Sequence, residues 1–334
     1  MNYPIIKDAN GWVISVNQDS KSEIVITNEK GKKYLIEVPE EDMKDLLSQH
    51  PDYASHFSLS SDIELPKKVE SEYKFLVSNG TWKEEVDSIK GEYYQQLYVA
   101  KDGNFWQARI RIHDGEHAKF TIKGPRVGIT NPEFEYSIAI EMAKEIWNES
   151  PGARLEKTRY KVQKGEDLWE IDEFVSPSLK GLYLTELEVS DVNKQIDKPL
   201  WAGVEVTHEK SFRNDSLADY NFKMKHLLSE NDELFFSVNK AGIMVSDEDL
   251  PDMPNISRLK SMLYFVISTG KNIKDDNVIE LLHDFGLQEH KESLSVKVVN
   301  EIVETMVSRN PVLQAKFLNN TVENLQKTNY KQKL

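Results

Sequence analysis

Like charges that share one face of a strand constrain this fold more than any other feature of the sequence. Residues 69–75 alternate at period two, so Glu70, Glu72 and Lys74 share one face and apolar or aromatic side chains take the other. Two carboxylates about 7 Å apart on one face are oxygen ligands that suit a divalent cation, and the lysine suits a phosphate oxygen. For one strand alone, the pattern equally describes a half-buried strand whose charged face lies in water.

The same pattern returns along the middle of the chain, and the sign of the charge changes from strand to strand. It recurs at residues 105–112, 119–123, 133–136, 157–160, 169–174 and 184–189, where the opposite face is mostly apolar. Charged strands of both signs indicate a shared polar interior, and an antiparallel barrel of about eight strands has room inside for one small ligand. We therefore expect an α+β protein built on an eight-stranded antiparallel β tunnel. A helix at 137–148 and the flanking modules would cover its apolar outer face.

The expected interior contains charges of both signs. Its cations are Lys74, Arg109, Arg111, Lys123, Lys157 and Arg159. Its anions are Glu70, Glu72, Glu133, Glu135, Asp172, Glu186 and Glu188. The cations match a chain of phosphates, which arginine binds bidentately, and the anions match one or two Mg²⁺ or Mn²⁺ ions. Because burying so many charges without a ligand is costly, we expect a hydrated tunnel that is open at an end.

Composition excludes several other classes of function. The chain has 334 residues, 39% of them hydrophobic, which suffices for two domains and a sizeable core. It has no cysteine, so thiolate chemistry and disulfides are excluded. The formal charge of −14 disfavours general nucleic-acid binding. The chain lacks an apolar run of membrane-spanning length, and residues 1–4 lack signal-peptide features, so we expect a cytoplasmic protein without a membrane partner.

We expect three segments: a small β-rich N-terminal module at 1–60 with α/β character, the tunnel domain at 67–220, and a helical C-terminal module at 221–334. In the first, residues 11–16, 22–27 and 33–38 read as strands, 28–31 as a turn and 39–50 as a helix; 58–66 reads as a linker. In the last, the helical segments are 256–269, 275–285, 294–307 and 311–328. This module is expected to dock on the tunnel domain, on a protein partner or on a second copy of the chain.

The charged blocks resemble those of a known family, in the same order. Glu70-x-Glu72-x-Lys74 resembles the ExExK motif of the CYTH superfamily, the triphosphate tunnel metalloenzymes. Gln96-Leu97-Tyr98 is similar to the Gln-Gly-Tyr of bacterial members, with Leu97 in the glycine position. Further similar blocks occupy residues 109–111, 121–124, 133–136, 156–160, 170–174, 186–188, 199–201, 205–207 and 214–218. The resemblance covers roughly residues 67–220.

The resemblance implies an eight-stranded tunnel with metal-dependent catalysis on inorganic triphosphate, nucleoside triphosphates, thiamine triphosphate or RNA 5′-triphosphate; one class makes cyclic AMP. It implies phosphate binding by Lys74, Arg109, Arg111, Lys123 and Arg159. It implies metal binding by Glu70, Glu72, Asp172, Glu186 and Glu188. Lys157 and Tyr98 correspond to a pair that activates the attacking water. A base needs a lowered pKa, and the alternative for Lys157 is a phosphate-binding cation.

The sequence departs from the family at two positions. Asn131 stands where bacterial members carry an arginine, so we expect a gap on the tunnel wall. Arg126, in the same loop, is the alternative phosphate-binding residue that would fill this gap. Ser211-Phe212 replaces a basic-aromatic pair. Both departures bear on the choice of substrate.

Three functions are compatible with these residues. The first is hydrolysis of inorganic or nucleoside triphosphate with Mg²⁺ or Mn²⁺. The second is a non-catalytic module that senses a triphosphate or nucleotide and passes the state to its flanking domains. The third is a class IV-type adenylyl cyclase, whose His-Phe element is absent in register, because His56-Phe57 lies too far upstream.

Overall fold

The computed structural model describes residues 2–17, 22–50, 68–86, 90–103, 105–229, 310–312, 314–316 and 318–319. The expected linker at 58–66 and the expected helices at 256–269, 275–285 and 294–307 lie outside these residues. Within the expected helix at 311–328, the residues that are described are helical. No helix in the described ranges is long and apolar enough to cross a membrane.

The N-terminal module is a four-stranded antiparallel sheet followed by a helix. Its strands β1 (Asn2–Lys7), β2 (Val13–Asn17), β3 (Glu23–Thr27) and β4 (Lys33–Glu37) pair in sequence order, and α1 spans Glu40–Gln49. The expected strands, turn and helix are confirmed, but β1 was not predicted. A register shift between Pro4 and Ile6 leaves both Ile5 and Ile6 buried, so β1 lacks the alternation that identifies a strand.

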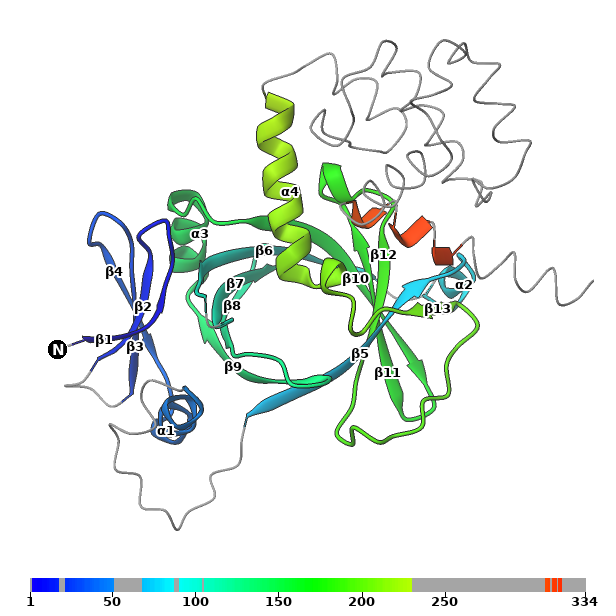
Figure 1. Ribbon diagram of the computed structural model, residues 1–334, viewed down its shortest axis with the longest axis horizontal. Coiled ribbons are helices and arrows are strands. Elements are labelled where there is room, and N and C mark those ends of the chain that lie inside the picture. The colour runs from blue at the N-terminus through cyan, green and yellow to red at the C-terminus, as the bar shows by residue number, and fades with distance from the viewer. Residues whose placement is uncertain are drawn as a thin grey trace, which may run out of the picture. The chain divides into compact units, whose positions relative to one another are not determined.

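Eight strands form the expected antiparallel barrel, which is closed (Figure 1). They are β5 (Val69–Val77), β6 (Glu92–Lys101), β7 (Gln107–His113), β8 (His117–Lys123), β9 (Thr130–Ile138), β10 (Arg154–Lys164), β11 (Asp167–Phe174) and β12 (Tyr183–Glu188). Their order is β12-β11-β10-β6-β7-β8-β9-β5, and pairing of β12 with β5 completes the ring. A ninth strand, β13 (Ala202–Glu205), pairs with the end of β5, and a short helix, α2 (Trp82–Val86), follows β5.

Cross-strand register places the charged residues on one face of the barrel wall. Arg109 on β7 pairs with Tyr98 on β6 and with Thr121 on β8, and Thr121 pairs with Glu135 on β9. Arg111 pairs in the same way with Gln96 and Lys119. Because side chains directly opposite each other point to the same side of a sheet, these rows line the interior, and the intervening apolar residues point outward.

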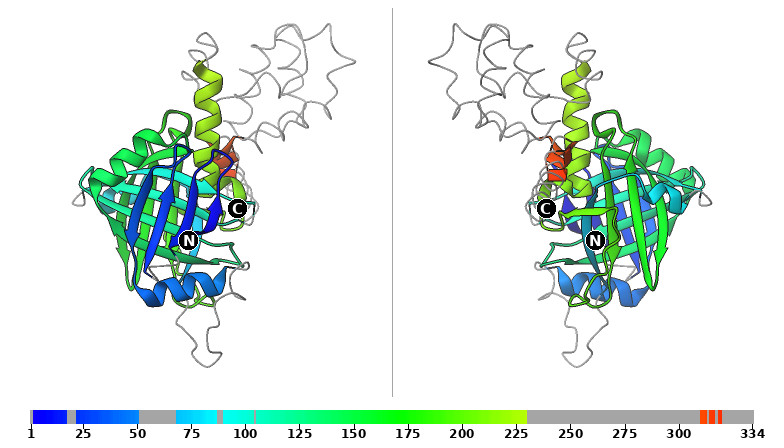
Figure 2. Two further views of the ribbon diagram at one scale, coloured as in Figure 1. Left: turned by 90° about the vertical axis from the view of Figure 1, so that its left-hand side faces the viewer. Right: turned by 90° about the vertical axis from the view of Figure 1, so that its right-hand side faces the viewer.

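The apolar outer face of β6–β9 is covered by the N-terminal module and by α3 (Ile140–Glu149). One hydrophobic core joins Trp12 and Leu46 of the module to Ile110 and Phe120 of the barrel and to Ile146 of α3. Figure 2 shows the sheet β1–β4 lying across the barrel strands. Each such buried side chain contributes about 1.5–3 kcal/mol to stability. The expectation that a helix and the N-terminal module cover the barrel is confirmed, whereas most of the C-terminal module lies outside the described residues.

The polypeptide forms two compact units. One consists of Met1–Lys74, Lys83–Asp172 and Glu186–Lys198, and it contains every tunnel residue discussed below. The other consists of Phe75–Trp82, Glu173–Thr185 and Pro199–Leu334. In the second unit, α4 (Asn214–Ser229) contacts the 3₁₀ turns Pro177–Leu179 and Lys210–Phe212. The division into three segments at residues 60 and 220 stays a prediction.

Candidate active site

One wall of the tunnel pairs the arginines of β7 with the carboxylates of β9. Arg109 Nη2 donates to Glu133 Oε1 at 3.1 Å, and Arg111 Nη2 donates to Glu135 Oε2 at 2.6 Å. Lys123 bridges Glu133 Oε2, at 2.9 Å, to Glu70. Burial opposes ionisation of Glu133, but Lys123 and Arg109 outweigh it and lower the pKa of that carboxyl. Glu133 and Glu135 are therefore counter-ions of the basic wall in this arrangement.

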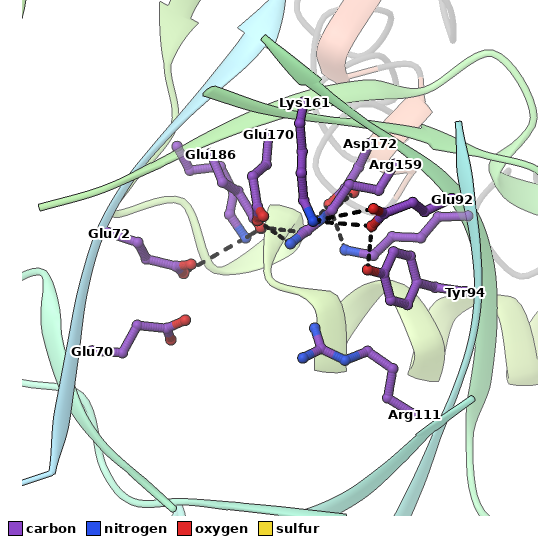
Figure 3. A network of polar contacts seen from close by, with 12 residues as sticks. Glu70, Glu72, Glu92, Tyr94, Arg111, Arg159, Lys161, Glu170, Asp172 and Glu186 are labelled. Atoms are coloured by element: carbon purple, nitrogen blue, oxygen red, sulfur yellow. Dashed lines mark hydrogen bonds and ion pairs between the residues drawn. The ribbon is translucent and has the colours of Figure 1, made fainter. Parts of the chain in front are cut away.

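A buried ion network centred on Asp172 occupies the opposite wall (Figure 3). Arg159 donates from Nε and Nη2 to the two oxygens of Asp172, each at 2.7 Å, and from Nη2 to Glu186 Oε2 at 2.6 Å. The Lys157 amine donates to Asp172, and Lys74 Nζ lies 2.8 Å from Glu186 Oε1. Both oxygens of Asp172 are thus occupied by protein cations, and this network fixes the three basic side chains.

Two cations of the tunnel are incompletely neutralised. Burial and the neighbouring Arg109 lower the pKa of Arg111 in spite of its partner Glu135. Burial and the adjacent Arg159 lower the pKa of Lys157 to about 8. In both cases the protein disfavours the charged form, and an anion placed beside these groups would restore it. This part of the tunnel is therefore complementary to an anion.

The acidic side has the opposite imbalance and suits a cation. Glu188 is partly desolvated although it is exposed to solvent, and this effect together with the nearby Glu70, Glu170 and Glu72 raises the pKa of its carboxyl. Within the described residues, Glu188 has no hydrogen bond or ion pair. No three described His, Asp or Glu side chains form a ready-made metal cage. The donor set nevertheless consists of carboxylate oxygens that repel one another, which is the chemistry that binds Mg²⁺ or Mn²⁺. These residues fit a divalent cation.

The aromatic ring of Tyr94 lies near two predicted phosphate-binding arginines, Arg111 of β7 and Arg159 of β10. The Tyr94 ring centroid is 5.4 Å from the Arg111 guanidinium and 5.9 Å from that of Arg159. Its hydroxyl donates to Glu92 Oε2 at 2.7 Å, and its ring stacks on His113 at 4.6 Å. These residues and Glu170 were not predicted as site residues. The period-two alternation from Tyr98 back along β6 was the signal that would have found Tyr94.

Lys157 and Tyr98, the predicted catalytic pair, both face the tunnel but lie at different heights along its axis. Lys157 lies opposite Tyr94 in the β6–β10 register, and Tyr98 lies further along β6. Four residues of strand correspond to about 13 Å. Gln96 Nε2 donates to Tyr98 Oη at 2.6 Å, which fixes the position of the hydroxyl. The pairing of Tyr98 with Lys157 stays a prediction.

The two residues of the predicted departure lie in different elements: Arg126 is in the loop between β8 and β9, and Asn131 is the second residue of β9. Asn131 is buried opposite Glu70 in the register, and its side chain donates to the carbonyl of Pro132 at 3.4 Å. Arg126 lies against Glu72 of β5, with Nη1 3.3 Å from Glu72 Oε1. Both residues thus contact the ExExK strand, and the roles expected of them in ligand binding stay predictions.

Comparisons with known proteins agree with this geometry. A model of the CYTH domain matches residues 68–218. The inorganic triphosphatase of Acetivibrio thermocellus is 36% identical over 157 residues, which are 46% of this chain and 96% of that protein. The inorganic triphosphatase of Nitrosomonas europaea is 32% identical over 128 residues, which are 37% of this chain and 82% of that protein. A solved inorganic triphosphatase is 28% identical with a TM-score of 0.34, covering 45% of this chain and 93% of the solved one. The chain has the ExExK strand and the closed tunnel, and it is 36% identical to the Acetivibrio thermocellus protein over 96% of that protein's length, so it belongs to the CYTH family.

Proposed function

We propose that this protein hydrolyses a linear triphosphate, inorganic or nucleoside-bound, within the barrel and with a divalent metal ion. The observation that carries the proposal is the double imbalance of charge in the tunnel. Burial outweighs the partners Glu135 and Asp172 and lowers the pKa of Arg111 and of Lys157. The pKa of Glu188 is raised, and so is that of Glu70 in spite of its partner Lys123. A metal–triphosphate complex supplies both missing charges at once. The two named relatives are inorganic triphosphatases, which supports inorganic triphosphate as the first substrate to test.

The basic residues are assigned to the phosphate chain. Positioning and charge neutralisation account for most of the catalysis of phosphoryl transfer. Arginines hold phosphate oxygens in a fixed fork and lysines act as point charges. The proposed phosphate-binding residues are Lys74, Arg109, Arg111, Lys123 and Arg159. Asp172 holds Lys157 and Arg159 in place, because both of its oxygens accept hydrogen bonds from them.

The acidic residues are assigned to Mg²⁺ or Mn²⁺. The proposed ligands, direct or through water, are Glu70, Glu72, Glu170, Glu186 and Glu188. When bound, the ion neutralises phosphate charge and prepares a water molecule for in-line attack. Glu186 also contacts Lys74 and Arg159, so it links the acidic residues to the phosphate-binding ones.

Lys157 is proposed to accept the proton of the attacking water. Its pKa of about 8 makes the neutral amine accessible near physiological pH. The alternative, a cation that binds phosphate, requires the protonated amine. Tyr98 is proposed as the second catalytic residue; Gln96 fixes the position of its hydroxyl, and it lies further along β6 than the level of Lys157.

The test is incubation of the protein with tripolyphosphate, and separately with ATP, in the presence of Mg²⁺ or Mn²⁺. We expect orthophosphate and pyrophosphate from tripolyphosphate, and no release in excess EDTA. Release of pyrophosphate together with cyclic AMP from ATP would instead identify a cyclase. Tight binding of triphosphate without turnover under either metal would identify a sensing module and refute the proposal.

We also propose a cytoplasmic location and an interaction of the C-terminal segment with the tunnel domain, a partner or a second copy. The absence of a membrane-spanning helix in the described ranges and the formal charge of −14 are compatible with both. Fractionation of cells and size-exclusion chromatography with light scattering test the two proposals.

A further inference from the structure

Arg126 is fastened in place by four hydrogen bonds. Its Nη2 donates to the carbonyls of Glu72, at 2.9 Å, and Ile129, at 3.2 Å. Its Nε donates to the carbonyl of Gly128 at 3.2 Å, and its Nη1 donates to Glu72 Oε1 at 3.3 Å. A guanidinium has five N–H groups, so one remains. One N–H group is too few for the bidentate pair of hydrogen bonds with which arginine binds a phosphate.

These contacts fix one oxygen of Glu72 and leave the other available. Glu72 Oε1 receives Arg126, and Lys74 Nζ lies 3.9 Å from the same oxygen. Within the described residues, no hydrogen bond is made to Oε2. Figure 3 shows the Glu72 side chain extending from β5 into the tunnel, near Glu70 and Glu186. The carboxylate thus presents one free oxygen in an orientation that the protein sets.

The same arginine ties the β8–β9 loop to the backbone of the ExExK strand. The amide of Glu72 donates to the carbonyl of Ile129 at 3.2 Å, and Arg126 donates to that carbonyl as well. Gly128 has a φ of +63°, a conformation that glycine adopts without strain, and it turns its carbonyl toward Arg126. The Arg126 side chain therefore connects the β8–β9 loop, the backbone of β5 and the carboxylate of Glu72.

We propose that Arg126 is a positioning residue for metal binding, which acts by orienting Glu72 as an oxygen ligand and does not contact the phosphate chain. The inference rests on the proposed metal site but not on triphosphate hydrolysis. Groups that orient a metal ligand typically contribute 10–100-fold to metal affinity. Lysine at this position keeps the charge but cannot reproduce the fork that reaches several acceptors at once.

The test measures Mn²⁺ binding to the full-length protein without substrate, by electron paramagnetic resonance of free Mn²⁺. We expect Arg126→Lys and Arg126→Ala to weaken Mn²⁺ binding by about 10–100-fold. At saturating metal, the KM for tripolyphosphate should stay within about threefold of the wild-type value, since Arg126 does not touch the phosphates. In a double-mutant cycle, Arg126→Ala should add nothing to the loss already caused by Glu72→Gln.

Arg154 provides a matched control. It also donates to backbone carbonyls, those of Trp147 and Ser150, but it belongs to the outer face of β10. Arg154→Ala should lower the melting temperature and leave Mn²⁺ affinity unchanged, which separates loss of stability from loss of a positioned ligand. Unchanged Mn²⁺ affinity in both Arg126 variants overturns the proposal, and a raised KM for tripolyphosphate in them would place Arg126 on the phosphates. Wild-type protein that binds Mn²⁺ but hydrolyses no triphosphate would refute the proposed function alone.

Discussion

At the scale of single residues, Glu186 and Glu188 are adjacent on the tunnel face of β12 but have different electrostatic surroundings. Glu186 contacts Lys74 at 2.8 Å and Arg159 at 2.6 Å and is buried, whereas Glu188 is exposed and has no ion pair within the described residues. We expect Glu186→Gln to destabilise the protein by roughly 3–5 kcal/mol, because it leaves buried cations without their partner. Glu188→Gln should leave stability unchanged or slightly higher, since it removes a carboxylate that its neighbours repel.

Both substitutions should abolish metal-dependent turnover. Urea unfolding curves and phosphate release, measured on the same preparations, check the two halves of this prediction. Equal stability losses in the two variants would mean that Glu188 has a partner cation. Normal turnover in Glu188→Gln would remove it from the metal site.

The buried amine of Lys157 predicts the pH dependence of the reaction. Burial and Arg159 hold its pKa at about 8, below the ordinary lysine value, so the neutral base becomes populated as pH rises through 8. We therefore expect kcat/KM for tripolyphosphate to rise with pH and level off above about 8, because this parameter reports the free enzyme. The variant Lys157→Met should lack this rise of kcat/KM with pH and should lose most of the rate. If kcat/KM instead falls as the pH rises through 8, Lys157 acts as a phosphate-binding cation.

At the scale of structural elements, β6 and the loop before β10 approach each other closely at Gly152. A Cβ at this position would lie 2.0 Å from the carbonyl oxygen of Tyr98, and the Tyr98 amide already donates to Ala153 at 2.9 Å. Gly152→Ala must displace a strand that contributes Tyr94, Gln96 and Tyr98 to the tunnel. We expect a loss of stability of about 1–3 kcal/mol and a clear reduction in kcat.

Gly103→Ala is the matched control, because nothing lies within 4 Å of a Cβ there. It should change neither thermal stability nor rate. If Gly152→Ala behaves like Gly103→Ala, the loop yields without moving β6, and the packing at Tyr98 does not control the geometry of the site.

The elements also show which parts of this fold a sequence can reveal. Alternation of charge identified the barrel strands other than β6 and the face that Arg109, Arg111 and Glu135 occupy, since side-chain direction is a local property. It could not reveal that β10 pairs with β6, because pairing between distant strands is set by packing of the whole barrel. The charge pattern did not include Tyr94, because a tyrosine side chain has no charge. The contacts of Arg126 could not be predicted either, because they depend on the shape of a loop that has no repeating sequence pattern.

At the scale of the whole molecule, the C-terminal part of the chain returns to earlier elements of its own unit. Ser211 donates to Gln314 at 2.6 Å, and Asn319 donates to the carbonyl of Val77 at 3.1 Å. Val312, which is 2% exposed, belongs to the same unit. Truncation after Tyr220 removes these contacts, so we expect a lower melting temperature and increased binding of a hydrophobic dye. A soluble, monomeric fragment of equal stability would show that residues 221–334 fold independently.

The seam between β5 and β12 has a consequence for how this protein folds and unfolds. It joins the first and last strands of the barrel, as in the bond from the Val189 amide to the Ser71 carbonyl at 2.9 Å. Contacts between such distant segments form slowly, because the intervening chain must first be ordered. A ligand that needs both walls binds only after the seam has closed, and its binding energy is added to the native state alone. Metal and triphosphate together should therefore lengthen the lifetime of the native state while leaving the refolding rate nearly unchanged.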